Sequence, residues 1–146
     1  MTMFDSMNVS SSGLSAQRLR MKVITSNIAN VNTTRTPGGG PYRRKDTIFA
    51  AMPSNQSFLE QLKNQEQDQG IREVKVVGVV EDSRPPKMKY DPSHPDANEE
   101  GYVELPNIDI VEEVTNMMIA KRSFEANIAA INATKQMIIK TLEIGK

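Results

Sequence analysis

Apolar residues recur every seven positions along the last forty residues of the chain, and this repeat constrains the fold more than any other feature. Two interleaved sets follow it at spacings of four and three, and eight of their ten members are apolar. The sets are Ile110, Met117, Phe124, Ile131 and Ile138, and Val114, Lys121, Ile128, Lys135 and Leu142. Such heptads are typical of a helix that packs against another helix. They predict one helix, N-capped by Asn107 and roughly 45–50 Å long, which is too long for a domain of this size to cover.

A weaker repeat of the same kind lies near the start of the chain and predicts a helix from about residue 12 to residue 30. Its shared face carries Leu14, Met21, Ile24, Ile28 and Val31. The asparagine-rich segment SNIANVNTT and the glycines that follow it end this helix.

Helix breakers separate these two flanks. All eight prolines, and six of the eight glycines, fall between Pro37 and Pro106. The chain therefore divides into an N-terminal helical region (1–36), a Pro/Gly-rich middle segment with short strands (37–106) and a C-terminal helix (107–146). The predicted fold class is mainly α: long N- and C-terminal helices paired as a coiled-coil-like hairpin, with a small irregular β-containing middle segment.

The middle segment is weak as a domain of its own. Strands are predicted at 71–82, at 42–49 and at 101–105, where β-branched and aromatic residues gather. The polar stretch 54–70 is predicted to be a loop or short helix, and 83–101 a polyproline II or turn segment. Two or three strands make a marginal sheet, so we expect the middle to lean on the helices.

Each helix also carries a second stripe opposite its apolar face. Small residues form it on the C-terminal helix, at Ala126, Ala130 and Ala133. Ala16, Leu19 and Val23 form it on the N-terminal helix. Alanine alone can reflect helix propensity, but the repeat of the pattern in both helices favours packing against another molecule.

Asparagine is a poor helix former, yet several asparagines lie inside the predicted helices. Asn27 and Asn127 lie beside the apolar seams, where a buried amide sets register by demanding a partner. Formal charge is also uneven: it is +5 over residues 1–46, −1 over 47–80, −7 over 81–113 and +3 over 114–146. Solvated faces explain this division, and alignment of neighbouring copies is the alternative.

Several function classes are disfavoured. A formal net charge of +0 argues against nucleic-acid binding, and no apolar stretch is long enough to insert into a membrane. No cysteine is present for a disulfide or a thiolate site. Asp91, His94 and Asp96 are the one cluster that invites a metal or catalytic interpretation, but His94 is the sole histidine and lies between turn-forming prolines. We therefore expect no catalytic residues, no cofactor and no metal.

The two flanks resemble the terminal motifs of bacterial flagellar axial proteins, the rod, hook and hook-associated subunits. The N-terminal motif is the run GLSAQRLRMKVITSNIANVNTTRTPGGGPYRRK, and the C-terminal motif is PNIDIVEEVTNMMIAKRSFEANIAAINATKQMIIKTLEIG. The short length and the stretch VVEDSRPPKMKYDPSHPDANEEGYVELPN are similar to those of a proximal rod subunit. Phe124 stands where the family commonly has tyrosine, which keeps the ring and removes a hydroxyl.

The resemblance implies a non-enzymatic structural subunit of the rod in the flagellar basal body, which crosses the periplasm. It implies partners among the other flagellar rod subunits, the protein at the junction of rod and MS ring, and the flagellar type III export apparatus. The start MTMFDSMNVSSSG lacks the apolar core of a secretory signal, which agrees with export without signal cleavage.

Residues assigned to the helix seams and to assembly follow from both lines of reasoning. They are Leu14, Met21, Ile24, Asn27, Ile28, Asn30, Val31, Ile110, Val114, Met117, Phe124, Asn127, Ile128, Ile131, Ile138 and Leu142. Two alternatives remain open: a self-contained coiled-coil homo-oligomeric adaptor, and a metal-dependent enzyme around His94.

Overall fold

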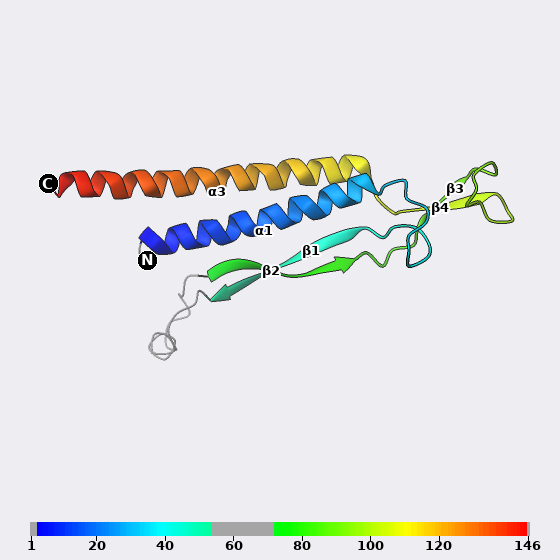
Figure 1. Cartoon of the computed structure of the whole chain (residues 1–146), viewed down its shortest axis with the longest axis horizontal. Helices are drawn as coiled ribbons and strands as arrows, with labels where there is room; N and C mark the ends of the chain where they lie inside the picture. The colour runs from blue at the N-terminus through cyan, green and yellow to red at the C-terminus, as the bar shows by residue number, and fades with distance from the viewer. Residues whose placement is uncertain (1–2, 54–71, 146) are drawn as a thin grey trace. The chain divides into compact units, whose positions relative to one another are not determined.

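The computed structural model describes residues 3–53 and 72–145, and the predicted loop or short helix at 54–70 lies outside these residues. Two long helices, α1 (Met3–Ala29) and α3 (Ile110–Ile144), flank four strands in the chain (Figure 1). The strands are β1 (Lys45–Pro53), β2 (Arg72–Glu81), β3 (Lys87–Tyr90) and β4 (Tyr102–Leu105). The predicted mainly α fold class, with a small β-containing middle, is confirmed.

Helix α1 begins nine residues earlier than the sequence pattern predicts. Its first turns are rich in serine, which competes with helical hydrogen bonding when its hydroxyl is free. Here the hydroxyls bond back along the helix, from Ser10 to the Ser6 carbonyl at 2.9 Å and from Ser12 to the Val9 carbonyl at 2.7 Å. At the other end, the Asn30 side-chain amide bonds the Ser26 carbonyl at 2.8 Å and helps to close the last turn.

The N-cap of α3 is Asp109 rather than the predicted Asn107. The Asp109 carboxylate accepts hydrogen bonds from the Val111 N–H at 2.8 Å and the Glu112 N–H at 3.4 Å. A carboxylate at this position satisfies free backbone donors and interacts favourably with the helix dipole. Helix α3 therefore begins at Ile110.

Strands pair in two separate two-stranded sheets, β1 with β2 and β3 with β4. In the second sheet the strands are antiparallel, and Lys87 lies opposite Leu105 while Tyr90 lies opposite Tyr102. The prediction missed β3, because KMKY lies in a proline-rich stretch and has no alternating pattern of its own. Its pairing with β4, and the edge-on contact of the Tyr90 and Tyr102 rings at 5.3 Å, give it strand structure instead.

Tertiary contacts group the chain into two units, each built from separate stretches. Unit 1 contains residues 1–19, 49–77 and 120–146, and unit 2 contains residues 20–48 and 78–119. Among the described residues, the apolar side chains that are buried are few: Ala16 and Ala120 in unit 1, and Ile24, Val103 and Ile108 in unit 2. No described helix has the length and apolar character that a membrane span requires.

The N-cap of α3 predicts that alanine substitution destabilises the helix at Asp109 but not at Asn107. Replacing Asp109→Ala leaves two backbone donors of α3 without their acceptor, which destabilises the helical form by about 1 kcal/mol. The matched change Asn107→Ala leaves the cap intact. Thermal unfolding followed by far-ultraviolet circular dichroism, at a concentration where the chain is helical, should show a lower midpoint for the first variant alone. A lower midpoint for Asn107→Ala alone would assign the cap to that residue instead.

Candidate assembly site on the paired helices

A fully buried amide joins α1 to the start of β1 and to α3. The Asn27 amide nitrogen donates to the Lys45 carbonyl at 2.8 Å and to the Glu113 carboxylate at 3.0 Å. Its oxygen accepts from the Lys45 N–H at 2.9 Å and from the Tyr42 hydroxyl at 3.2 Å. Both donors and both acceptor positions of the side chain are thus used, which allows Asn27 to be 0% exposed.

Glu113 is the second member of this junction, and its side chain is 1% exposed. One of its oxygens accepts from Asn27, and the other accepts from the Arg44 Nε at 2.7 Å. Burial by itself lowers the pKa of Arg44, but hydrogen bonds and charges from Glu113 and Asp46 outweigh it and leave that pKa above its ordinary value. The guanidinium therefore stays charged opposite the buried carboxylate. We call Asn27, Arg44 and Glu113 the polar junction.

Sequence reasoning found one part of this junction and missed the rest. Asn27 was predicted to take a buried partner beside the seam, and the structure places it so; its role in register stays a prediction. Glu113 was assigned to the first turn of its helix as a dipole-compensating acid. The signal that identifies it is spacing, because it lies seven residues before Ala120 and fourteen before Asn127.

In unit 1 the two helices approach at a glycine. A Cβ built on Gly13 would lie 2.8 Å from the Asn127 Nδ2, so this amide occupies the space of the missing side chain. One heptad away, the Ser6 and Thr134 hydroxyls lie 3.5 Å apart. The pairs 6 with 134 and 13 with 127 define an antiparallel register, and the pair 27 with 113 in unit 2 has the same register. Small and polar residues therefore occupy these three contacts.

This register corrects half of the predicted seam on α3. Met117, Phe124, Ile131 and Ile138 are half-buried, as a seam requires. The set that interleaves with them is Glu113, Ala120, Asn127 and Thr134, one residue before the predicted set. Ile110, Val114, Ile128 and Leu142 are 51%, 43%, 39% and 69% exposed, so they do not form a seam within the chain. The sequence prediction selected heptad positions by their apolar residues. In the structure, three of the four interior positions of the second set instead hold polar side chains that have partners on α1.

On α1 the predicted seam residues are all at least half-buried. Ile24 and Asn27 are buried, and Leu14, Met21, Ile28, Asn30 and Val31 are intermediate. The predicted outward stripe is wrong at Ala16, which is 4% exposed. Strand β2 contacts α1 nearby: the Val74 N–H donates to the Ser12 hydroxyl at 3.1 Å, one helical turn from Ala16. The chain's own ribbon thus meets this face of α1.

Helix α3 keeps most of its other faces uncovered. Ala126, Ala130 and Ala133, predicted to face another molecule, are exposed. Large apolar side chains are exposed beside them and along the rest of the helix. They include Val111 at 75%, Met118 at 53%, Ile119 at 49%, Met137 at 52%, Ile139 at 44% and Ile144 at 86%. Together with the four exposed members of the predicted seam, they leave ten large apolar side chains exposed on the 35 residues of α3.

The cluster around His94 has a structural role in the described chain. The His94 Nδ1 accepts a hydrogen bond from the Asp96 N–H at 3.1 Å, and the Ser93 hydroxyl donates to Asp91 at 2.8 Å. That bond from Ser93, with the Lys89 charge, lowers the pKa of Asp91 despite partial desolvation. Within residues 3–53 and 72–145, no group of three acidic, histidine or cysteine side chains is arranged to hold a metal ion.

Comparison with known proteins matches both flanks and the full length. A family described as flagella basal body rod protein matches residues 7–35, and one described as flagellar basal body rod FlgEFG protein C-terminal matches residues 99–144. Flagellar basal-body rod protein FlgC of Borreliella burgdorferi is 48% identical over 99% of this chain and 98% of that protein. The FlgC proteins of Bacillus subtilis and Salmonella typhimurium are 45% and 37% identical, each over 100% of both chains.

Removing one partner from the polar junction should be far more harmful than removing a neighbouring exposed acid. Glu113→Ala leaves the Arg44 Nε and one N–H of the buried Asn27 amide without an acceptor, although Asp46 still pairs with Arg44 and the Lys45 carbonyl with Asn27, so we expect a loss of about 2–4 kcal/mol. Thermal unfolding followed by circular dichroism, at a concentration where the chain is helical, measures this loss of stability. Glu112→Ala is the matched control, because Glu112 is 57% exposed and lies 3.9 Å from Arg44; we expect a loss below about 1 kcal/mol. Equal effects of the two changes would contradict the junction.

The contact at Gly13 predicts that Gly13→Ala shifts the unfolding midpoint in opposite directions depending on the residue at position 127. Gly13→Ala alone pushes the new methyl group against the Asn127 amide and lowers the unfolding midpoint. In an Asn127→Ala background the space is free, so the same change raises the midpoint through helix propensity, by about 1 kcal/mol. A double-mutant cycle measured by thermal unfolding tests this. If Gly13→Ala has the same effect in both backgrounds, the two residues do not pack against each other.

Proposed function

The chain belongs to the family of flagellar basal-body rod proteins and is a structural subunit of the rod; we propose that it enters the rod by packing the exposed faces of its terminal helices against neighbouring subunits. The predicted resemblance is confirmed by relatives that match over the full length. The apolar surface of α3 carries the proposal for how the subunit assembles.

The energetics favour assembly over a free monomer. Full burial of a Val, Ile, Leu or Met side chain is worth about 1.5–3 kcal/mol, and α3 leaves ten such side chains more than a third exposed. Against this, the buried apolar side chains of unit 1 are two alanines among the described residues. Ordering the backbone costs about 1–2 kcal/mol per residue. A core this small offsets little of that cost until neighbouring subunits cover the helices.

The finer parts of the proposal follow from the family. We place the subunit in the proximal rod, next to other rod subunits and the protein at the junction with the MS ring. We infer delivery through the flagellar type III export apparatus without signal cleavage, which a thin core would assist because export needs an easily unfolded chain. The role is non-enzymatic, without metal or cofactor; the buried polar groups of the junction are engaged with one another, which supports a structural use.

The test is assembly-dependent folding. The full chain alone at micromolar concentration should show low helicity by far-ultraviolet circular dichroism, and helicity should rise when purified rod subunits are added. Met137→Asp places a charge on the exposed face of α3 and should abolish the rise, whereas Met137→Leu, which keeps the site apolar, should preserve it. Met137 is half-exposed, so neither change disturbs the chain's own packing.

Two outcomes would overturn this mode of assembly. One is a lone chain that is fully helical, monomeric and melts cooperatively. The other is a discrete small oligomer formed in the absence of rod subunits, seen by light scattering, which would favour the self-contained coiled-coil adaptor. Equal behaviour of the aspartate and leucine variants would remove Met137 and its face from the contact.

A further inference from the structure

A turn rich in basic residues follows α1 in unit 2. Residues 35–45, which we call the basic turn, contain Arg35, Arg43, Arg44 and Lys45 and no acidic residue. Arg44 is committed to the polar junction, and Lys45 lies 3.6 Å from Glu81. Arg35 and Arg43 are exposed, and neither makes an ion pair with any described residue. Two guanidinium groups of this turn are therefore available to another molecule.

Local hydrogen bonds hold the basic turn in shape. The Thr36 N–H donates to the Gly40 carbonyl and the Gly39 N–H to the Thr36 carbonyl, both at 2.9 Å. Gly39 and Gly40 have positive φ angles of 83° and 71°, a conformation that glycine adopts without strain. The turn is thus ordered before any partner arrives, which lowers the entropy lost on binding.

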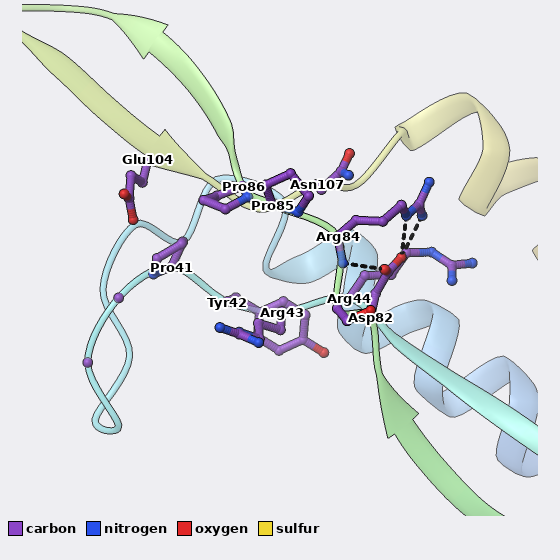
Figure 2. A pocket seen from close by; sticks show the side chains of 13 residues that line it. Pro41, Tyr42, Arg43, Arg44, Asp82, Arg84, Pro85, Pro86, Glu104 and Asn107 are labelled. Carbon is purple, nitrogen blue, oxygen red and sulfur yellow. Dashed lines mark hydrogen bonds and ion pairs between the residues drawn. The ribbon is translucent and has the colours of Figure 1, made fainter.

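A cleft of about 290 Å³ lies beside this turn (Figure 2). Pro41, Tyr42 and Arg43 line it from the turn, and Arg84, Pro85 and Pro86 from the segment between β2 and β3. Within the cleft, Arg84 forms an ion pair with Asp82, and its Nη2 lies 2.6 Å from the Asp82 Oδ2. The hydrogen bonds from Arg84 lower the pKa of Asp82 to about 2. Arg43 and Glu104 are thus the charged side chains of the cleft that form no ion pair with a described residue, and Arg43 lies next to the Pro41 and Tyr42 of the turn.

The hairpin between β3 and β4 carries the opposite charge. Its tip, residues 91–101, contains Asp91, Asp96, Glu99 and Glu100 and no lysine or arginine; we call it the acidic tip. Asp96 accepts a hydrogen bond from the Thr34 hydroxyl at 2.8 Å, and Asp91 lies 3.8 Å from Lys89. Glu99 and Glu100 are exposed, and their carboxylates have no partner among the described residues.

Local hydrogen bonds also hold the acidic tip in shape. The Asn98 side chain accepts hydrogen bonds from the Glu100 N–H at 3.1 Å and the Tyr102 N–H at 2.8 Å, which fixes the strand-facing end of the loop. Gly101 has a φ of 80°, and a side chain there would meet the Tyr90 ring at 3.0 Å. The hairpin therefore presents its two free glutamates from a defined frame.

We propose that the acidic tip of one copy docks on the basic turn of a second copy, with Glu99 and Glu100 facing Arg35 and Arg43. This rests on the proposed rod function, which brings copies of the chain together. Within one copy Arg35, Arg43, Glu99 and Glu100 form no ion pair with a described residue, although Arg35 lines a second cleft together with Asp96 and Glu104. Complementary charges on two ordered surfaces steer and orient association more than they add affinity, so the contact sets the relative position of neighbours.

Single-cysteine variants of the full chain test the contact, because the natural sequence has no cysteine. One copy carries Gly38→Cys in the basic turn, and an affinity-tagged copy carries Pro95→Cys in the acidic tip; both positions are exposed and uncharged. A short bismaleimide should join the two copies at low salt. The heterodimer should fall about tenfold when Glu99→Lys and Glu100→Lys are added to the tip copy, or Arg35→Glu and Arg43→Glu to the turn copy. It should return when both reversed copies are mixed.

The control is a copy with Ser15→Cys, exposed on α1, in place of Gly38→Cys. Three results would overturn the proposal: a yield no higher than with this control, a yield that ignores the charge reversals, or no recovery when both reversed copies are combined. None of these substitutions lies on α3. The circular-dichroism assay therefore tests the proposed function independently of the cross-link. A failed cross-link would reject the contact between tip and turn and leave the proposed function standing.

Discussion

The hydrogen bonds of the Asn27 amide with the Lys45 backbone and the Glu113 carboxylate are the contacts on which the rest of unit 2 depends. They join α1, the first residue of β1 and the first turn of α3, three segments that lie far apart in the sequence. Arg44 adds the balancing charge from the residue before β1. Because each group satisfies another, none can be removed without leaving a buried polar atom unpaired. The junction therefore specifies one arrangement of the helix ends and the strand between them.

We expect polar contacts of this kind to set the register of the helices more than they stabilise the fold. A buried ion pair gains little net free energy over an apolar pair of the same shape, because both charges lose their hydration. Small residues at the other heptad layers, Gly13 beside Asn127 and Ser6 beside Thr134, likewise contribute little burial. We therefore expect the helix pair to have one alignment and modest stability, a combination that suits a subunit whose faces are covered by its neighbours.

The sequence was sufficient to predict the two long helices, their pairing and the main strand, since these depend on periodicity and on the placement of proline and glycine. It was insufficient where a partner elsewhere in the chain decides the outcome. From the sequence, Glu113 looks like a solvent-exposed acid in the first turn of a helix. Its burial is favourable only because Arg44 and Asn27 donate hydrogen bonds to it. Ala16 has the sequence pattern of an outward face, yet it is buried in the folded chain. KMKY becomes a strand through Tyr102 and its neighbours rather than through its own residues.

The two units differ in what completes them. Unit 2 buries large side chains, Ile24, Val103 and Ile108, in addition to the polar junction. In the described part of unit 1, the buried residues are Ala16, Ala120 and Thr134, and larger seam residues such as Phe124 and Ile131 are only partly buried. Free energy from burial scales with apolar area, so unit 1 has less to offset the ordering of its helical segments. Unit 2 is therefore the part of the chain that holds its own alignment, and unit 1 is the part whose order depends most on coverage by neighbouring subunits.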